Sequence, residues 1–300
     1  MWRELVIRFL SAVCLAAALA TAAAADDFPS RPITLVVPYP PGGGNDVIAR
    51  IVAAKMSAAL GQPIVIENHA GAGGTIATRQ VAHTAPDGYT LLVATSSLAI
   101  NPSVYANVGY DPRADFSAVG LMAASQNVLL LHPAVPVASV AELIRRAKAA
   151  PAKLTFASTG GGNSVQLAAE LFAAMADIKL TQIPYKGNAP ALSDLLGGHV
   201  DMMFAPLPGA IGFVKDSKVR ALAVTGARRS PLFPDLPTVA EAGLPGYESV
   251  LHYGIVAPAG VPQPIVEKLN AALRTALAAA DVAERLTTDG AEVLASTPEV

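Results

Sequence analysis

Two glycine-rich stretches hold the residues of this chain that are best suited to chemistry. Tyr39–Asp46 and Ser158–Ser164 each follow an apolar run typical of a strand and precede a helical pattern. Backbone N–H groups at the start of such a helix are free to bind an anion. Neither stretch contains lysine or arginine, so the pattern favours a carboxylate held by backbone amides. Two capped turns without a ligand are the alternative interpretation.

Hydroxyl groups near these stretches would add hydrogen-bond donors. Some follow a predicted strand at 89–94, and the others belong to the second stretch. Polar residues at the carboxyl end of a strand in a parallel sheet lie in the crevice where α/β proteins bind ligands. The residues concerned are Thr95, Ser96, Ser97, Ser158, Thr159 and Ser164. Each charge-assisted hydrogen bond to a carboxylate would contribute about 1.5–3 kcal/mol.

The sequence lacks the motifs of several enzyme classes. There is no P-loop, and Val47, Ile76 and Val165 stand where G-x-G-x-x-G needs its last glycine. No G-x-S-x-G nucleophile elbow is complete, and the five histidines have no metal-ligand spacing. We therefore expect no catalytic residue, no cofactor and no metal, and we expect that the protein is not an enzyme.

Strands and helices must bring the two stretches to one edge of a sheet. The apolar run 33–37 predicts a strand, and the apolar spacing after residue 46 predicts a helix that ends near Gly61. Asn45 and Asp46 are the expected N-cap residues of this helix. Because short apolar strands alternate with helices along the chain, we expect an α/β fold with mainly parallel sheets.

The chain is expected to form two lobes with a ligand cleft between them. Two extended runs, 118–122 and 128–131, flank a polar segment where we place the crossing into the second lobe. The return crossing is expected near 223–226. The predicted bounds are 1–25 for a signal peptide, 26–124 plus 227–300 for lobe 1, and 125–226 for lobe 2.

The N-terminal residues are expected to form a cleaved signal peptide. Arg3 and Arg8 precede an apolar stretch, and Ala23–Ala25 fits the A-x-A pattern before a cleavage site. The only cysteine, Cys14, lies in this leader, which excludes a disulfide scaffold or a thiol enzyme for the mature chain. The formal net charge is −2 and no basic run occurs, so we expect no nucleic-acid partner.

Six segments spread over the predicted mature chain carry a resemblance to a known family. They are 29–46 (PSRPITLVVPYPPGGGND), 68–74 (NHAGAGG), 86–91 (PDGYTL), 184–187 (PYKG), 194–204 (DLLGGHVDMMF) and 233–243 (FPDLPTVAEAG). In the same order they resemble segments of the Bug family, the periplasmic solute-binding proteins of tripartite tricarboxylate transporters. The resemblance implies a two-lobed periplasmic-binding fold of type II that closes on a small organic carboxylate.

The resemblance also implies partners and a ligand site. The expected partners are a carboxylate ligand and the integral membrane subunits of a transporter, and the protein is expected to be a periplasmic monomer. A periplasmic sensor that docks onto a signalling receptor is the alternative. Backbone amides of the matching loops typically hold one carboxylate in the family. The implied ligand-binding residues are Tyr39, Gly42, Gly43, Gly44, Asn45, Asp46, Thr95, Ser96, Ser97, Ser158, Thr159, Gly160, Asn163, Ser164, Phe204 and Ala205.

Overall fold

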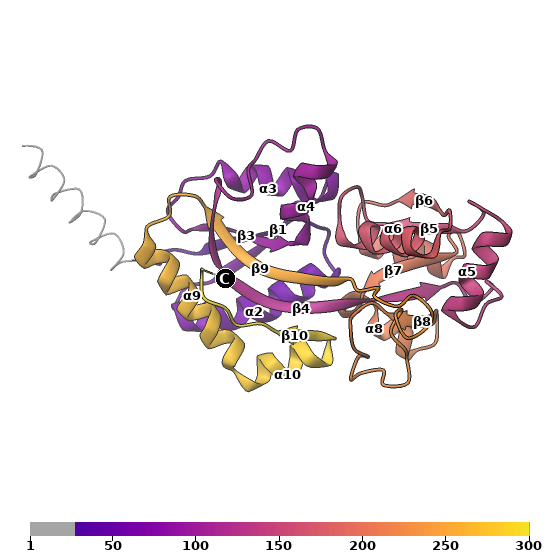
Figure 1. Cartoon of the computed structure of the whole chain (residues 1–300). Coiled ribbons are helices and arrows are strands. Elements are labelled where there is room, and N and C mark those ends of the chain that lie inside the picture. The colour runs from indigo at the N-terminus through magenta and orange to yellow at the C-terminus, as the bar shows by residue number, and fades with distance from the viewer. Residues whose placement is uncertain (1–27, 300) are drawn as a thin grey trace, which may run out of the picture.

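The computed structural model describes residues 28–299, so the predicted signal peptide lies outside the described residues. Within this range the chain forms two α/β lobes that lie side by side (Figure 1). Among the described helices, none is both long and apolar enough to cross a membrane. The described residues also contain no group of three or more His, Cys, Asp or Glu side chains placed to hold a metal ion.

The first lobe is a sheet with helices on both faces. Its elements are β1 (Ile33–Val37), α2 (Gly44–Leu60), β2 (Ile64–Asn68), the 3-10 turn η1 (Ala72–Gly74), α3 (Thr75–Ala82), β3 (Thr90–Thr95), α4 (Ser96–Val104), β9 (Val250–Pro258), α9 (Gln263–Ala278), α10 (Ala280–Thr288) and β10 (Ala291–Val293). The strand β1 pairs in parallel with β2 and β3, whereas β9 is antiparallel to β3. Ile48 of α2 and Leu269 of α9 are buried in the main core of this lobe.

The second lobe repeats this plan with a smaller sheet. Its elements are α5 (Val140–Ala149), β5 (Thr155–Ser158), α6 (Ser164–Ala176), β6 (Thr181–Pro184), α7 (Asn188–Leu196), β7 (Met202–Pro206), α8 (Leu207–Lys215) and β8 (Arg220–Val224). The strand β5 is parallel to both β6 and β7. Phe172 of α6 packs on one face of the sheet, and Leu192 of α7 packs on the other.

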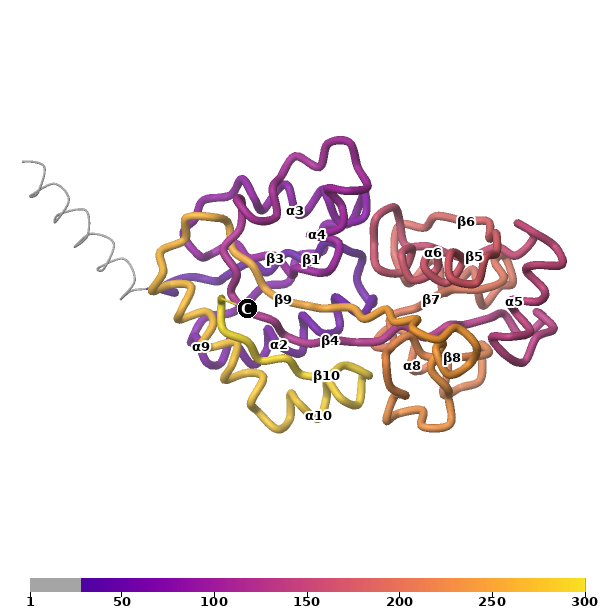
Figure 2. The backbone as a smooth tube through the Cα atoms, in the orientation of Figure 1, coloured from indigo at the N-terminus to yellow at the C-terminus, as the bar shows by residue number. Residues whose placement is uncertain are grey.

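One long strand, β4 (Phe116–Leu131), belongs to both lobes (Figure 2). It pairs with β9 as far as Gln126 and with β7 from Asn127 onward. The two extended runs expected from the sequence are therefore parts of one strand, which continues through the polar segment between them. The polar residues between the runs remain in the ladder because the antiparallel partners on both sides bind their backbone.

Residues 225–249 connect β8 to β9 and pack with the second lobe. Val239, Leu244 and Tyr247 belong to the same core cluster as Phe172. The ring of Tyr247 stacks on Phe204, and its hydroxyl donates to the backbone oxygen of Ala168 at 2.9 Å. These contacts favour a return crossing close to Val250, later than residue 226. The exact bounds of the lobes stay a prediction.

Candidate ligand-binding cleft

A small cavity of about 30 Å³ lies between the two lobes. Its lining comes from loops and helix starts of both lobes, and no charged side chain is among the described residues that line it. The lining residues are Tyr39, Pro40, Gly43, Gly44, Asn45, Thr95, Thr159, Asn163, Ser164, Val165, Asn188, Pro206 and Leu251.

Five helices begin at this cavity. Gly44 is the first residue of α2, Ser164 of α6 and Asn188 of α7, while Thr95 and Pro206 are the N-cap residues of α4 and α8. The first N–H groups of a helix have no partner within it, and the helix dipole places partial positive charge at that end. The cavity is therefore electropositive without any lysine or arginine in its lining.

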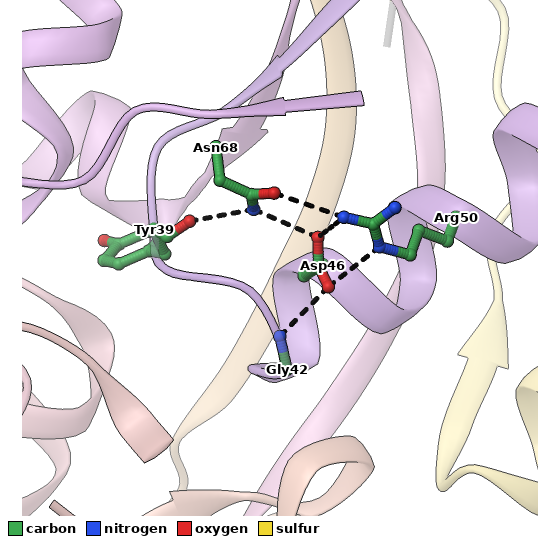
Figure 3. A network of polar contacts seen from close by, with 5 residues as sticks. All are labelled: Tyr39, Gly42, Asp46, Arg50 and Asn68. Atoms are coloured by element: carbon green, nitrogen blue, oxygen red, sulfur yellow. Dashed lines mark hydrogen bonds and ion pairs between the residues drawn. The ribbon is translucent and has the colours of Figure 1, made fainter. Parts of the chain in front are cut away.

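The first glycine-rich loop is held in shape by Asp46 (Figure 3). One carboxylate oxygen accepts the N–H of Gly42 and Nε of Arg50, both at 3.0 Å. The other oxygen accepts the side-chain amide of Asn68 at 3.0 Å, and that amide also donates to the backbone oxygen of Tyr39. Both ends of the loop are thus tied to one buried carboxylate.

This network corrects the N-cap expected from the sequence. The N-cap of α2 is Gly43, which has no side-chain cap, so neither Asn45 nor Asp46 occupies that position. Asp46 lies in the first turn and its side chain reaches back to Gly42, outside the helix. The N–H groups of Gly44 and Asn45 are consequently left free beside the cavity. A side-chain cap would have covered these N–H groups in part.

The ionisation of Asp46 is set by the same contacts. Burial raises the pKa of Asp46, but hydrogen bonds from Arg50, Gly42 and Asn68 outweigh burial, and the net pKa lies below the ordinary value of 3.8. A carboxyl whose pKa is lower in the folded state stabilises that state above the unfolded pKa. This contribution disappears as the pH falls through the folded pKa.

We expect Asp46 to make the protein sensitive to acid. The melting temperature of the wild type should exceed that of Asp46→Asn at pH 6, and the difference should shrink as the pH falls below 3.8. Thermal denaturation of both proteins from pH 6 down to pH 3 measures this, and the subtraction removes the effect of other carboxylates. A difference that stays constant over this range would contradict the assigned role.

The second glycine-rich loop is capped by its own side chains. Asn163 is the N-cap of α6, and its side-chain oxygen accepts the N–H of Gln166 at 2.9 Å. Gln166 reaches back to the N–H of Gly162 at 2.8 Å. Because these contacts bind the N–H groups of Gly162 and Gln166, those of Ser164 and Val165 are the ones left beside the cavity.

Tyr39 connects the first loop to the start of α4. Its hydroxyl lies 2.8 Å from the Ser97 hydroxyl and donates to the backbone oxygen of Gly73 at 3.2 Å. Burial raises the pKa of Tyr39, so the phenol stays protonated at neutral pH. Thr95 caps α4 by accepting the N–H of Ser97. Tyr39 and Thr95 line the cavity, whereas Ser97 supports them from outside the lining.

The structure brings half of the predicted site residues together around the cavity. Those in the lining are Tyr39, Gly43, Gly44, Asn45, Thr95, Thr159, Asn163 and Ser164. Those outside it are Gly42, Asp46, Ser96, Ser97, Ser158, Gly160, Phe204 and Ala205. Phe204 and Ala205 are fully buried in the cores of the second lobe. Whether any of these residues binds a ligand stays a prediction.

Five lining residues were not among the ligand-binding residues expected from the sequence, although Pro40 lies within the predicted stretch Tyr39–Asp46 and Pro206 in the loop after Phe204. They are Pro40, Val165, Asn188, Pro206 and Leu251. Signals for two of them exist, because Gly187 before Asn188 and the prolines around Leu207 both mark helix starts. Leu251 carries no such signal, since a leucine in a strand is expected in a core.

The two lobes touch directly at the rim of the cavity. The hydroxyl of Tyr105, just after α4, donates to the backbone oxygen of Gly161 at 2.8 Å. A Cβ added to Gly73 would lie 2.2 Å from that same oxygen, and one added to Gly187 would lie 2.6 Å from Pro40. Only a glycine fits at either position without a clash across the two lobes. The structure is therefore a closed arrangement of the lobes.

The family model described as "Tripartite tricarboxylate transporter family receptor" matches residues 48–299. The chain belongs to this family, TctC. Its members are periplasmic solute-binding proteins, and the resemblance found in the sequence is confirmed. Among curated relatives, a UPF0065 protein from the tcbD-tcbE intergenic region of a Pseudomonas species is 44% identical, over 92% of this chain and 82% of that protein.

Solved structures of TctC relatives confirm the two-lobed fold. An R. palustris protein solved with adipate has 39% identity and a TM-score of 0.89, covering 91% of this chain and 92% of that one. The periplasmic binding protein BugD has 39% identity and a TM-score of 0.87, with 91% and 92% covered. MatC from Rhodopseudomonas palustris, solved with malate, has 38% identity and a TM-score of 0.83, with 89% and 91% covered.

Proposed function

We propose that this chain captures a small organic carboxylate between its lobes and holds it by backbone amides. The observation that carries the proposal is the start of five helices at a cavity with no charged side chain in its described lining. Free N–H groups and helix dipoles attract an anion to such a place. The adipate and malate in the R. palustris structures support a carboxylate as the ligand.

The proposed route of the ligand is from the periplasm to a transporter. The chain would be exported with cleavage of residues 1–25, act as a monomer, and deliver its ligand to the integral membrane subunits of a tripartite tricarboxylate transporter. The description of the family as a transporter receptor supports this role. Closure gives a physical basis for delivery, because a membrane partner can distinguish closed lobes from open ones.

A bound acid is expected to raise the melting temperature. At a free concentration of 100 times Kd, binding to the native state adds about 2.7 kcal/mol to its stability. A thermal-shift panel of acetate, succinate, malate, adipate, benzoate and glutamate, each matched with sodium chloride of equal ionic strength, identifies the class of acid. If every acid left the melting curve at its sodium chloride value, the proposal would fail.

Transport and sensing can be separated in cells. Deletion of this gene should abolish uptake of the acid that the panel identifies, and the gene supplied on a plasmid should restore uptake. Unchanged uptake together with a lost transcriptional response to the acid would favour the sensor.

A further inference from the structure

Asn127 is a buried side chain whose amide has no protein partner. It is fully inaccessible to solvent, and among the described residues nothing bonds to its Oδ1 or Nδ2. Its backbone, in contrast, is satisfied: Thr225 accepts its N–H at 2.8 Å and donates to its backbone oxygen. Because a buried amide without partners is unfavourable, we expect its partner to come from outside the chain, either a buried water or a group of a bound ligand.

Asn127 is not itself among the described residues that line the cavity, but the strand register places it next to residues that are. Successive side chains of a strand alternate between faces, so Asn127 continues the row of Leu131 and Leu129 on β4. Its register partner on β7 is Pro206, which lines the cavity. Pro206 lies two residues after Phe204, on the same face of β7. Both rows lie in the core beneath α6, the helix whose first turn lines the cavity.

The other side of Asn127 also leads to the cavity. Ser125 lies two residues earlier on the same face of β4 and pairs in register with Leu251, which lines the cavity. The Ser125 hydroxyl lies 3.0 Å from that of Tyr253, so these two groups satisfy each other. Asn127 is therefore the unsatisfied group between two lining residues, Pro206 and Leu251.

The chemistry of the free groups defines what they can bind. A carboxylate accepts hydrogen bonds only, and the helix starts already supply donors for it. Asn127 offers an acceptor as well as donors, and the Oδ1 of Asn188, another lining residue, is a second buried acceptor without a partner. A hydroxyl both donates and accepts, whereas an ammonium group would be repelled by the positive helix ends.

We infer that Asn127 binds a hydroxyl group on the body of the captured acid, so that the cleft selects hydroxycarboxylates over the corresponding unsubstituted acids. The inference rests on the proposed function, because it needs the carboxylate to occupy the same cavity. It makes Asn127 a specificity residue for the body of the ligand, separate from the amides that hold the carboxylate.

The test compares acids that differ by one hydroxyl group. Calorimetric titration with malate against succinate, and with lactate against propionate, gives a preference ratio for each pair. In the wild type the hydroxy acid should bind about tenfold more tightly in at least one pair, the size of one good hydrogen bond. Asn127→Leu should reduce this ratio to about twofold or less while binding of the unsubstituted acid is retained.

Asn270→Leu is the matched control for burial of an asparagine. Asn270 lies in the first lobe and its amide donates to the backbone oxygens of Val119 at 2.7 Å and Ser296 at 2.9 Å. Asn270→Leu should lower the melting temperature of the ligand-free protein and keep the preference ratio. Asn127→Leu should instead reduce the preference ratio. Its melting temperature should be unchanged or higher, because the change removes a buried amide without partners.

The outcomes separate this inference from the proposed function. If a hydroxy acid and its unsubstituted partner bind equally to the wild type in both pairs, the inference is wrong and the carboxylate cleft stands. If Asn127→Leu keeps the preference or melts as low as Asn270→Leu, the side chain has a structural role and the inference is also wrong. If none of the four acids binds and the wider panel is silent too, the proposed function fails and the inference falls with it.

Discussion

Gly73→Ala is expected to keep the two lobes apart and to weaken ligand binding at least about tenfold, which corresponds to 1.4 kcal/mol. The added Cβ would lie 2.2 Å from the backbone oxygen of Gly161 and 3.0 Å from the hydroxyl of Tyr105. A backbone atom of the opposite lobe cannot rotate away from such a contact. The overlap is therefore relieved by separating the lobes, which opens the cavity that lies between them.

Gly61→Ala is the matched control for this change. Gly61 has φ of 69° and Gly73 has φ of 62°, so both positions carry the same backbone penalty for alanine, about 1–2 kcal/mol. An added Cβ at Gly61 meets nothing within 4 Å. Both variants should lose similar stability, but only Gly73→Ala should lose affinity and show a larger radius of gyration in solution scattering with the acid present. Equal affinities of the two variants would show that this contact does not control closure.

Asp46→Ala is expected to disorder the first glycine-rich loop, Tyr39–Asp46. The change removes the acceptor for Gly42, Arg50 and Asn68 together, and a buried polar group left without its partner costs about 1–3 kcal/mol. The loop from Tyr39 to Gly43 then loses the contacts that fix its ends. We expect an affinity loss of about tenfold or more, because the N–H groups of Gly44 and Asn45 no longer hold one geometry.

Asp281→Ala provides the comparison for loss of an ion pair. Asp281 binds Lys55 at 2.9 Å, but its side chain is 68% exposed. Exposed pairs contribute about 0–1 kcal/mol, so this variant should melt close to the wild type and bind the acid normally. Calorimetry and thermal denaturation of both variants measure the difference. An Asp46→Ala protein that binds as tightly as Asp281→Ala would refute the assigned role of the network.

The loops of the site could be predicted from the sequence because their signals are local. An apolar run, a glycine cluster and a helical pattern within about twenty residues are enough to place free N–H groups at a helix start. The missing cations in Tyr39–Asp46 and Ser158–Ser164 are equally visible in the sequence. These signals placed both loops, and they placed Thr95 at the end of β3, but they did not predict the helix α4 that begins there.

The remaining features depend on contacts between distant residues. Nothing near Asp46 indicates that its partner is Asn68 on β2 and that the carboxylate reaches back to Gly42. The continuity of β4 was missed because its polar residues look like a break, although both neighbouring strands keep them in the ladder. The same residues include Asn127, which only the register with Pro206 places beside the cavity.

The amide protons of the cavity give the most direct test of the central claim. In a titration followed by ¹H–¹⁵N NMR, with the acid that gives the largest thermal shift, the amides of Gly44, Asn45, Ser164 and Val165 should move downfield as they bond to the carboxylate. Amides of exposed helices such as α10 should stay in place. Saturable binding that leaves these four amides unchanged would contradict a carboxylate held by helix N-termini between the lobes.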